Sequence, residues 1–273
     1  MDGQVLAVVQ HKGGVGKTVV TVNLAAAMAR FLGLRVVILD LDGQRNATTG
    51  LLGWDHADLP APTIEHYLRG SATLDDVLHA YPGDDRLQII PGSIRSYHWM
   101  RETTVDPDAA KAAADAVRDE LTKRFDVVLI DTPPSETVAT EFALIMADGY
   151  LMPAQPDLFS ISGIRDTIEM AEAIHPRNMW LRAIGVVINQ YRGFKDERPL
   201  IDDLRDQYGD LILDLVIPMK VEHRRWAIMH EPLVYAPPGS VSGHTIYRLM
   251  AEDVWSRLKS GFDGTAQLAT TVR

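Results

Sequence analysis

Cysteine is absent from all 273 residues of the sequence, which excludes disulfides, thiolate metal sites, iron–sulfur ligation and cysteine nucleophiles. No apolar run approaches the roughly 18 residues that span a bilayer, and the N-terminal segment, which carries Asp2, lacks the basic and apolar pattern of a signal peptide. Basic residues are fewer than acidic residues, which gives a net charge of −10. Any affinity for nucleic acid must therefore come from a local basic patch. These absences predict a cytoplasmic protein that does not associate with membranes.

The composition is typical of a soluble globular protein, with 46% hydrophobic and 23% charged residues. A chain of this length buries about three quarters of its unfolded surface, so it needs no cross-links to hold a core. We expect one domain over residues 1–263. Residues 264–273 are small and polar, and they are expected to form a flexible tail.

Apolar segments of strand length alternate along the chain with longer segments of helical period. The expected strands are Val5–Gln10, Arg35–Asp40, Leu87–Ile90, Val127–Asp131, Tyr150–Ala154, Ala183–Asn189 and Leu213–Pro218. The expected helices are Lys17–Leu32, Asp108–Lys123, Glu136–Ala147, Ile161–Ala173 and Thr245–Leu258. This alternation predicts a doubly wound, mostly parallel α/β sheet flanked by helices, which binds ligands beyond the carboxyl ends of its strands. The stretch 53–83 breaks the alternation and predicts an irregular insertion with short helices over the sheet edge.

The first expected strand leads directly into a glycine-rich loop and then into a helix. The loop and the start of the helix contain Lys12, Gly13, Gly14, Val15, Gly16, Lys17, Thr18 and Val19. Glycine lets backbone N–H groups approach phosphate oxygens, and a helix N-terminus adds favourable partial charge. Lys17 is placed to bind the β and γ phosphates, and Thr18 to ligate magnesium. The alternative, a glycine-rich turn with an incidental lysine, does not account for strand, loop and helix in this order.

His11 stands where the eight-residue phosphate-loop consensus has its first glycine, so only the shorter form of the motif is met. This Lys-Gly-Gly-Val-Gly-Lys-Thr form resembles the deviant Walker A motif of the ParA and MinD family of ATPases. The resemblance implies a P-loop ATPase that uses ATP and Mg²⁺ and binds the nucleotide through residues 13–19. It also implies that Lys12 reaches the phosphates of a second copy in an ATP-dependent homodimer; the alternative is a solvated loop lysine.

Two aspartates, Asp40 and Asp42, follow the second expected strand. The stretch resembles the ParA switch Asp-x-Asp-Pro-Gln-Gly-Asn-Ala-Thr, with Gly43 in the position of its proline and Arg45 in the position of its glycine. By this resemblance Asp42 orients the attacking water and Asp40 lies near the magnesium shell, while the two replacements leave the rate of hydrolysis open. An Asx-turn role is the alternative for Asp42.

Asp131 ends a buried strand and matches the Walker B carboxylate of the same family. The resemblance implies that it holds magnesium, through a water molecule; the alternative is that it caps the following turn. Pro133 and Pro134 stop the strand and predict a stiff loop suited to sensing the γ phosphate.

Later segments supply candidates for the base pocket. Asn189 ends a strand, and the resemblance implies that its amide reads the adenine edge. The second wall of the base pocket is expected at Pro218 and Met219, which follow the next strand, although this segment also fits the core.

Basic residues gather in the same two segments. They are Arg192 and Lys195 after the first of these strands, and Lys220, Arg224 and Arg225 after the second, beside Trp226. ParA-like proteins bind DNA without sequence preference through residues of this kind, so the resemblance implies a non-specific DNA surface. The alternative is a solvated face balanced by neighbouring acidic residues.

The resemblance extends from Val5 to about Leu258 and implies a slow, partner-stimulated ATPase that acts in plasmid or chromosome partition. Its implied partners are a second copy of the chain, a ParB-like activating protein and non-specific DNA, with a nucleoid-associated location in the cytoplasm. The mixed charge of residues 252–259 differs from the basic amphipathic helix that ends MinD-like proteins, which argues against membrane anchoring. Two alternatives stay open: a positioning ATPase for non-DNA cargo such as a chemotaxis cluster or microcompartment, and a scaffold that hardly hydrolyses ATP.

Overall fold

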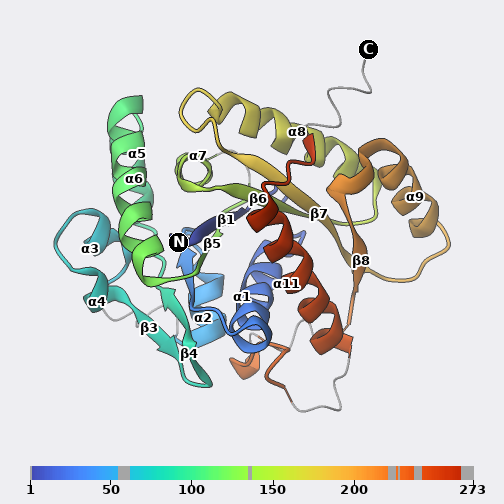
Figure 1. Cartoon of the computed structure of the whole chain (residues 1–273), viewed down its shortest axis with the longest axis horizontal. Coiled ribbons are helices and arrows are strands. Elements are labelled where there is room, and N and C mark those ends of the chain that lie inside the picture. Colours follow the sequence, from blue (N-terminus) through green and yellow to red (C-terminus); the bar gives the residue numbers. More distant parts are fainter. Residues whose placement is uncertain are drawn as a thin grey trace.

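A central sheet of eight strands runs through the residues that the computed structural model describes, which are 2–54, 62–134, 137–220, 226, 228–236 and 242–265 (Figure 1). The strand order is β3-β4-β2-β5-β1-β6-β7-β8, and every pairing is parallel except that of β3 with β4. The strands are β1 (Gln4–Val8), β2 (Val36–Asp40), β3 (His79–Tyr81), β4 (Asp84–Ile90), β5 (Val127–Asp131), β6 (Gly149–Ala154), β7 (Arg182–Tyr191) and β8 (Ile212–Pro218). The predicted doubly wound, mostly parallel fold is confirmed.

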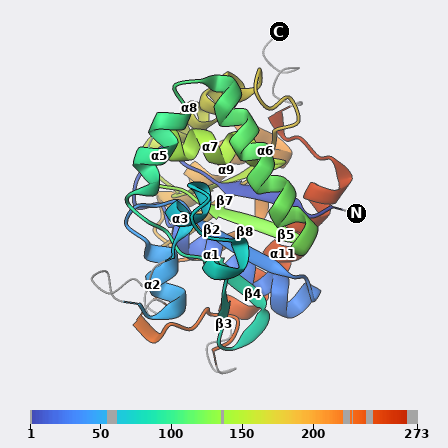
Figure 2. The ribbon, with the colours of Figure 1, turned by 90° about the vertical axis from the view of Figure 1, so that its left-hand side faces the viewer.

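Helices cover both faces of this sheet (Figures 1 and 2). One layer, which shares a buried core with the sheet, consists of α1 (Lys17–Leu32), α2 (Asn46–Leu52) and α11 (Ser242–Ser260). The opposite layer consists of α3 (Ile64–Leu68), α4 (Leu74–Val77), α5 (Ser96–Thr103), α6 (Pro107–Arg124), α7 (Val138–Met146), α8 (Leu158–Ile174) and α9 (Glu197–Tyr208). A short 3₁₀ turn, Gly209–Leu211, leads from α9 into β8.

The central strands are buried on both faces because helices cover each of them. All five residues of β2 and all five of β5 are buried, and four of the five in each are valine, isoleucine or leucine. The fifth residue is the last one, Asp40 in β2 and Asp131 in β5, and these two lie opposite one another in the parallel register. The sheet therefore carries two buried carboxylates side by side at its carboxyl edge.

The segment 53–83 contains the expected short helices, α3 and α4, although residues 55–61 lie outside the described residues. It also contains β3, an antiparallel edge strand that the sequence does not predict. The eight-residue helix α5 is likewise unexpected. The helix expected over residues 136–147 is α7, which begins at Val138 because Thr137 Oγ1 accepts a hydrogen bond from the N–H of Thr140 at 3.3 Å.

The start of the predicted C-terminal tail is attached to the sheet. The N–H of Gly264 donates to the carbonyl of Ala183 at 2.9 Å, and Thr265 donates to the carboxylate of Asp263 through both its N–H and its hydroxyl. Residues 266–273 lie outside the described residues. Within the described ranges, no helix combines the length and apolar character needed to cross a bilayer.

Candidate functional site

The loop between β1 and α1 contains two glycines in the left-handed region, Gly14 (φ 76°) and Gly16 (φ 90°). Gly16 is the N-cap of α1, and this residue supplies no side-chain hydrogen bond to the start of the helix. A β-carbon on Gly16 would overlap the Nδ2 atom of Asn189, whereas one on Gly14 would meet nothing within 4 Å. Both positions favour glycine for conformation, and Gly16 needs it for space as well. The uncapped helix N-terminus beside the loop is a favourable place for an anionic phosphate.

Asn189 lies beneath this loop and is 4% exposed. Its Nδ2 donates to the carbonyl of Val15 at 2.8 Å, and its Oδ1 accepts from the N–H of Gln190 at 2.9 Å. Gln190 has a φ of 60°, lines the adjoining cavity and donates from its side chain to the carbonyl of Gly14 at 2.8 Å. Recognition of adenine by Asn189 stays a prediction, because in this structure its amide braces the loop.

Lys17 is buried, with 7% exposure, at the start of α1. Its Nζ donates to the carbonyl of Gln10 at 3.1 Å and to that of Lys12 at 3.4 Å. Burial lowers the pKa of Lys17, and the nearby charges of Asp131 and Asp42 oppose this effect. The ammonium group therefore lines the cavity while it is hydrogen-bonded to two backbone carbonyls.

Asp40 and Asp131 are fully buried, but their oxygens have different partners. One oxygen of Asp40 accepts from the N–H of Thr48 at 2.9 Å and from its hydroxyl at 2.6 Å, and the other accepts from the N–H of Asp42 at 3.2 Å. Burial raises the pKa of Asp40 to about 7, although the hydrogen bonds from Thr48 oppose the shift. Burial, together with the charge of Asp40, raises the pKa of Asp131 well above its ordinary value.

Asp131 retains an oxygen that suits a cation. Its Oδ1 accepts from the hydroxyl of Thr21 at 3.2 Å, and the side chain of Thr18 opposes the rise in the pKa of this carboxylate. Its Oδ2 is buried and has no hydrogen-bond partner among the described residues. Those residues contain no group of three histidine, cysteine or acidic side chains around one point, but magnesium commonly needs only one or two carboxylates besides hydroxyl, water and phosphate oxygens. Thr18 and Asp131 therefore fit magnesium.

Asp42 lines the cavity and is 7% exposed. Its Oδ1 accepts from the N–H of Gln44 at 2.9 Å, which is the Asx turn that the sequence offered as an alternative role. The side chain of Asp42 therefore forms the Asx turn and lines the cavity at the same time. Arg45, two residues after Gly43, adopts a φ of 58° directly before α2, a conformation that glycine takes at lower cost.

Lys12 is held within its own chain by the N-terminus of α8. Its Nζ lies 2.6 Å from Oδ2 of Asp157 and 3.3 Å from Oε1 of Gln155, and 5.8 Å from the centre of the Phe159 ring. Asp157 also caps α8 by accepting from the N–H of Ser160 at 2.9 Å. Burial opposes ionisation of Asp157, but the contacts from Lys12 and Ser160 outweigh it, and its pKa is lowered. Lys12 is thus paired within its own chain.

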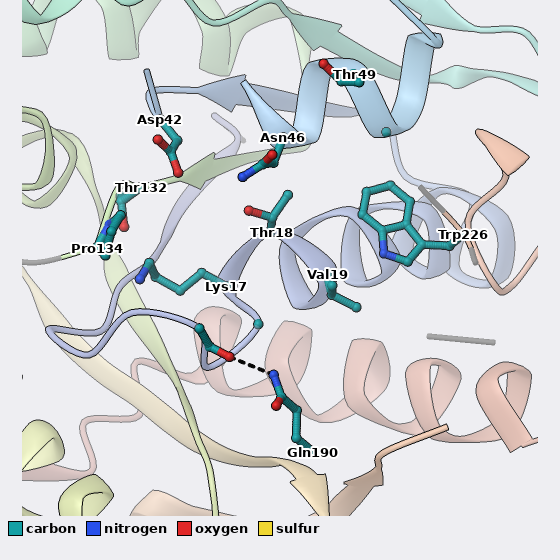
Figure 3. A pocket seen from close by; sticks show the side chains of 13 residues that line it. Lys17, Thr18, Val19, Asp42, Asn46, Thr49, Thr132, Pro134, Gln190 and Trp226 are labelled. Atoms are coloured by element: carbon teal, nitrogen blue, oxygen red, sulfur yellow. Dashed lines mark hydrogen bonds between the residues drawn. The ribbon is translucent and has the colours of Figure 1, made fainter. Parts of the chain in front are cut away.

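The glycine loop, the switch segment (residues 40–48) and α2 surround a cavity of about 530 Å³ (Figure 3). Six of the predicted site residues line it directly: Gly14, Gly16, Lys17, Thr18, Val19 and Asp42. The other lining residues are Asn46, Thr49, Gly50, Thr132, Pro134, Gln190 and Trp226. The sequence analysis assigned none of them to a binding site, although it expected Pro134 in a stiff loop that senses the γ phosphate. Asn46 belongs to the switch stretch that carries the family resemblance, which was the available signal for it, and Thr49 follows directly after that stretch. No local signal indicated Trp226.

The remaining predicted residues lie around this cavity or outside the described residues. Gly13, Val15, Asp40, Asp131, Asn189, Pro218 and Met219 are not among its lining residues. Met219 connects the ends of β7 and β8, because its N–H donates to the carbonyl of Tyr191 at 2.7 Å and its sulfur accepts from Nε of Arg192 at 3.3 Å. Lys195 and Lys220 are exposed near this junction, whereas Arg224 and Arg225 lie outside the described residues. The candidate base wall and DNA surface stay predictions.

Sequence comparison gives relatives over nearly the whole chain. A family model described as an AAA domain matches residues 3–182. The chromosome-partitioning ATPase Soj of Thermus thermophilus is 31% identical over 259 residues, which cover 93% of this chain and 96% of Soj.

Comparison with solved structures gives the same architecture. Cobyrinic acid a,c-diamide synthase of Mycobacterium smegmatis, with bound ADP and magnesium, has a TM-score of 0.77 and 26% identity, covering 96% of this chain and 97% of that one. An ATP complex of McdA from Cyanothece has a TM-score of 0.75, and the alignment covers 95% of this chain and 96% of that one. With 17% identity, this second likeness concerns the fold alone.

The contact between Gly16 and Asn189 predicts a difference between two glycine substitutions in one loop. Gly14→Ala and Gly16→Ala both place alanine at positive φ, at a cost of about 1–2 kcal/mol. Only Gly16→Ala also displaces the amide of Asn189, so we expect it to reduce the free energy of unfolding by at least about 1 kcal/mol more than Gly14→Ala. Urea denaturation measures both values, and equal reductions would contradict a close approach at Gly16.

Proposed function

The chain belongs to the AAA-domain family of ParA-type P-loop ATPases, and from this premise we propose that it is an ATP-dependent switch for DNA partition. Three features that meet at one cavity support ATP binding and hydrolysis: the uncapped N-terminus of α1, the buried ammonium of Lys17 and the carboxylate of Asp42. The likeness to Soj over nearly the full length of both chains supports partition as the process served.

In this proposal the loop residues bind the triphosphate of ATP. The N–H groups at the start of α1 and the ammonium of Lys17 compensate the phosphate charge, and Lys17 exchanges its two backbone carbonyl partners for phosphate oxygens. Thr18 and Asp131 would hold Mg²⁺, which would supply positive charge to the phosphates. Asp42 accepts a hydrogen bond from the attacking water and orients it toward the γ phosphate.

The switch substitutions do not remove Asp42 from the cavity. Arg45 adopts the left-handed conformation that a glycine would adopt there, so the backbone keeps its path into α2. Asp42 keeps its turn hydrogen bond to Gln44 and still lines the cavity. This geometry favours a hydrolysing enzyme over a scaffold that only binds ATP.

The proposed homodimer requires Lys12 to change partners. In the single chain its ammonium is bound by Asp157 and Gln155, so a reach to the phosphates of a second copy requires these hydrogen bonds to break. The Lys12 and Asp157 side chains are 29% and 35% exposed, so water can compensate part of this cost. We therefore expect ATP to favour a dimer in which Lys12 exchanges Asp157 for the partner's phosphates.

Hydrolysis should depend on Asp42. In Asp42→Ala, ATP still binds while single-turnover hydrolysis falls by roughly 100-fold, because the attacking water no longer has the carboxylate that orients it. The matched control is Asp85→Ala, which removes an exposed aspartate of β4 and should leave the rate unchanged. Hydrolysis at the wild-type rate by Asp42→Ala would sink this assignment.

Dimerisation should respond in opposite directions to changes in one ion pair. Lys12→Ala should stay monomeric with a slowly hydrolysed ATP analogue and Mg²⁺, whereas Asp157→Asn should dimerise at a lower concentration of the analogue, because it frees Lys12. Lys111→Ala, which removes an exposed pair with Asp115 on α6, is the control and should dimerise as the wild type does. Sedimentation velocity measures all four proteins, and normal dimerisation of Lys12→Ala would overturn the role of Lys12.

DNA binding is the experiment that tests the partition role. Binding to unrelated duplex DNA should require ATP and weaken with salt. Arg192→Ala combined with Lys195→Ala should reduce the salt slope by about one for each DNA phosphate that the variant no longer neutralises. The control combines Arg101→Ala with Lys123→Ala, on α5 and α6 at the other edge of the molecule (Figure 1). Absence of duplex binding in every nucleotide state would instead favour a non-DNA cargo, with the ATPase proposal intact.

A further inference from the structure

Trp226 lies at the end of the cavity away from the phosphate-binding lysine. In Figure 3 its indole ring and Lys17 are on opposite sides of the view, with Thr18 and Val19 between them. The residue is 4% exposed and lines the cavity together with Val19 and Gly50. This end of the cavity is therefore largely apolar, whereas the end formed by Lys17, Asp42 and Thr18 is charged and polar.

A glycine inside α2 makes room for the indole ring. Gly50 is the fifth of seven residues in this helix, where glycine is destabilising by roughly 0.5–1 kcal/mol relative to alanine. A β-carbon built on Gly50 would lie 2.5 Å from Cζ3 of Trp226 and closer still to Cη2. Any larger residue at position 50 would therefore displace the ring, and the position of Trp226 accounts for a glycine that the helix itself disfavours.

Asn189, which the sequence analysis placed against the base, makes its hydrogen bonds to the protein backbone. Its Nδ2 donates to the loop carbonyl of Val15 and its Oδ1 accepts from the N–H of Gln190 in β7, and Asn189 does not line the cavity. When the phosphates lie at Lys17, the other end of the same cavity is open to the nucleoside. The aromatic ring at that other end is Trp226, and aromatic rings stack on nucleobases with useful affinity.

We propose that Trp226 is a specificity-determining residue of the nucleotide site, whose indole packs against the base of a bound purine nucleotide. The proposal rests on the proposed ATP site and adds the residue that recognises the base. Different residues then bind different parts of the ligand. Lys17 and the loop hold the phosphates, and Trp226 contributes to affinity only when a base is present.

Two ligands that differ by the nucleoside test this separation. Isothermal titration with Mg²⁺ compares ADP with inorganic tripolyphosphate, which has no base. Trp226→Ala should weaken ADP binding by roughly tenfold or more and leave tripolyphosphate binding unchanged, whereas Trp226→Phe keeps a ring and should weaken ADP binding by less than about threefold. Gly50→Ala should resemble Trp226→Ala, because it displaces the ring without removing it.

Intrinsic fluorescence provides an independent measurement. ADP should change the emission of the wild type and of Trp180→Phe, which removes a 74% exposed tryptophan, but the change should disappear in Trp226→Phe. Unchanged ADP affinity in Trp226→Ala, or equal weakening for ADP and tripolyphosphate, would overturn the proposal and leave the ring as core packing. A wild-type protein that binds neither ligand would overturn the ATP site itself, which is a distinguishable failure.

Discussion

The rest of the site depends on two carboxylates that the parallel register places side by side in the core. Asp40 and Asp131 end adjacent strands, both are fully buried, and burial raises the pKa of each. Buried carboxylates need donors or cations nearby, and the two are supplied differently. Thr48 and the N–H of Asp42 satisfy Asp40, whereas Asp131 keeps an oxygen without a partner among the described residues. The geometry therefore favours Asp40 as an anchor of the switch segment and Asp131 as the cation ligand.

Local sequence patterns were sufficient for the fold and for one end of the cavity. The strand, glycine loop and helix are consecutive, so spacing alone places Lys17 and Thr18, and fully apolar strands predict a parallel sheet. The other end depends on contacts between residues that are far apart in the sequence. Asn189 is hydrogen-bonded to Val15, which lies 174 positions earlier, and Trp226 packs against Gly50. The hydrophobic periodicity of a sequence does not indicate which distant residues come into contact. The strand β3 was missed for a different reason, since three residues at a sheet edge are too few to show alternation.

The pairing of Lys12 with Asp157 joins the loop to α8, and a second contact reinforces this connection. Gln10, just before the loop, accepts a hydrogen bond from the hydroxyl of Thr167 in α8 at 2.9 Å, and both residues are buried. A buried polar contact of this kind resists separation because its partners would be left unsatisfied. The partly exposed ion pair is easier to break than the buried hydrogen bond, so the exchange of partners proposed for Lys12 would leave the loop attached to α8.

The helix α2 connects the two ends of the proposed nucleotide site. It begins directly after the switch turn, its Thr48 bonds to Asp40, and its Gly50 packs against the indole of Trp226. In the proposed site, this hydrogen-bonded helix of seven residues thus lies between the switch segment and the ring that packs against the base. A triphosphate without a base would occupy the charged end alone. In the proposed site, α2 therefore connects the anchor of the switch segment at Asp40 with the indole that meets the base.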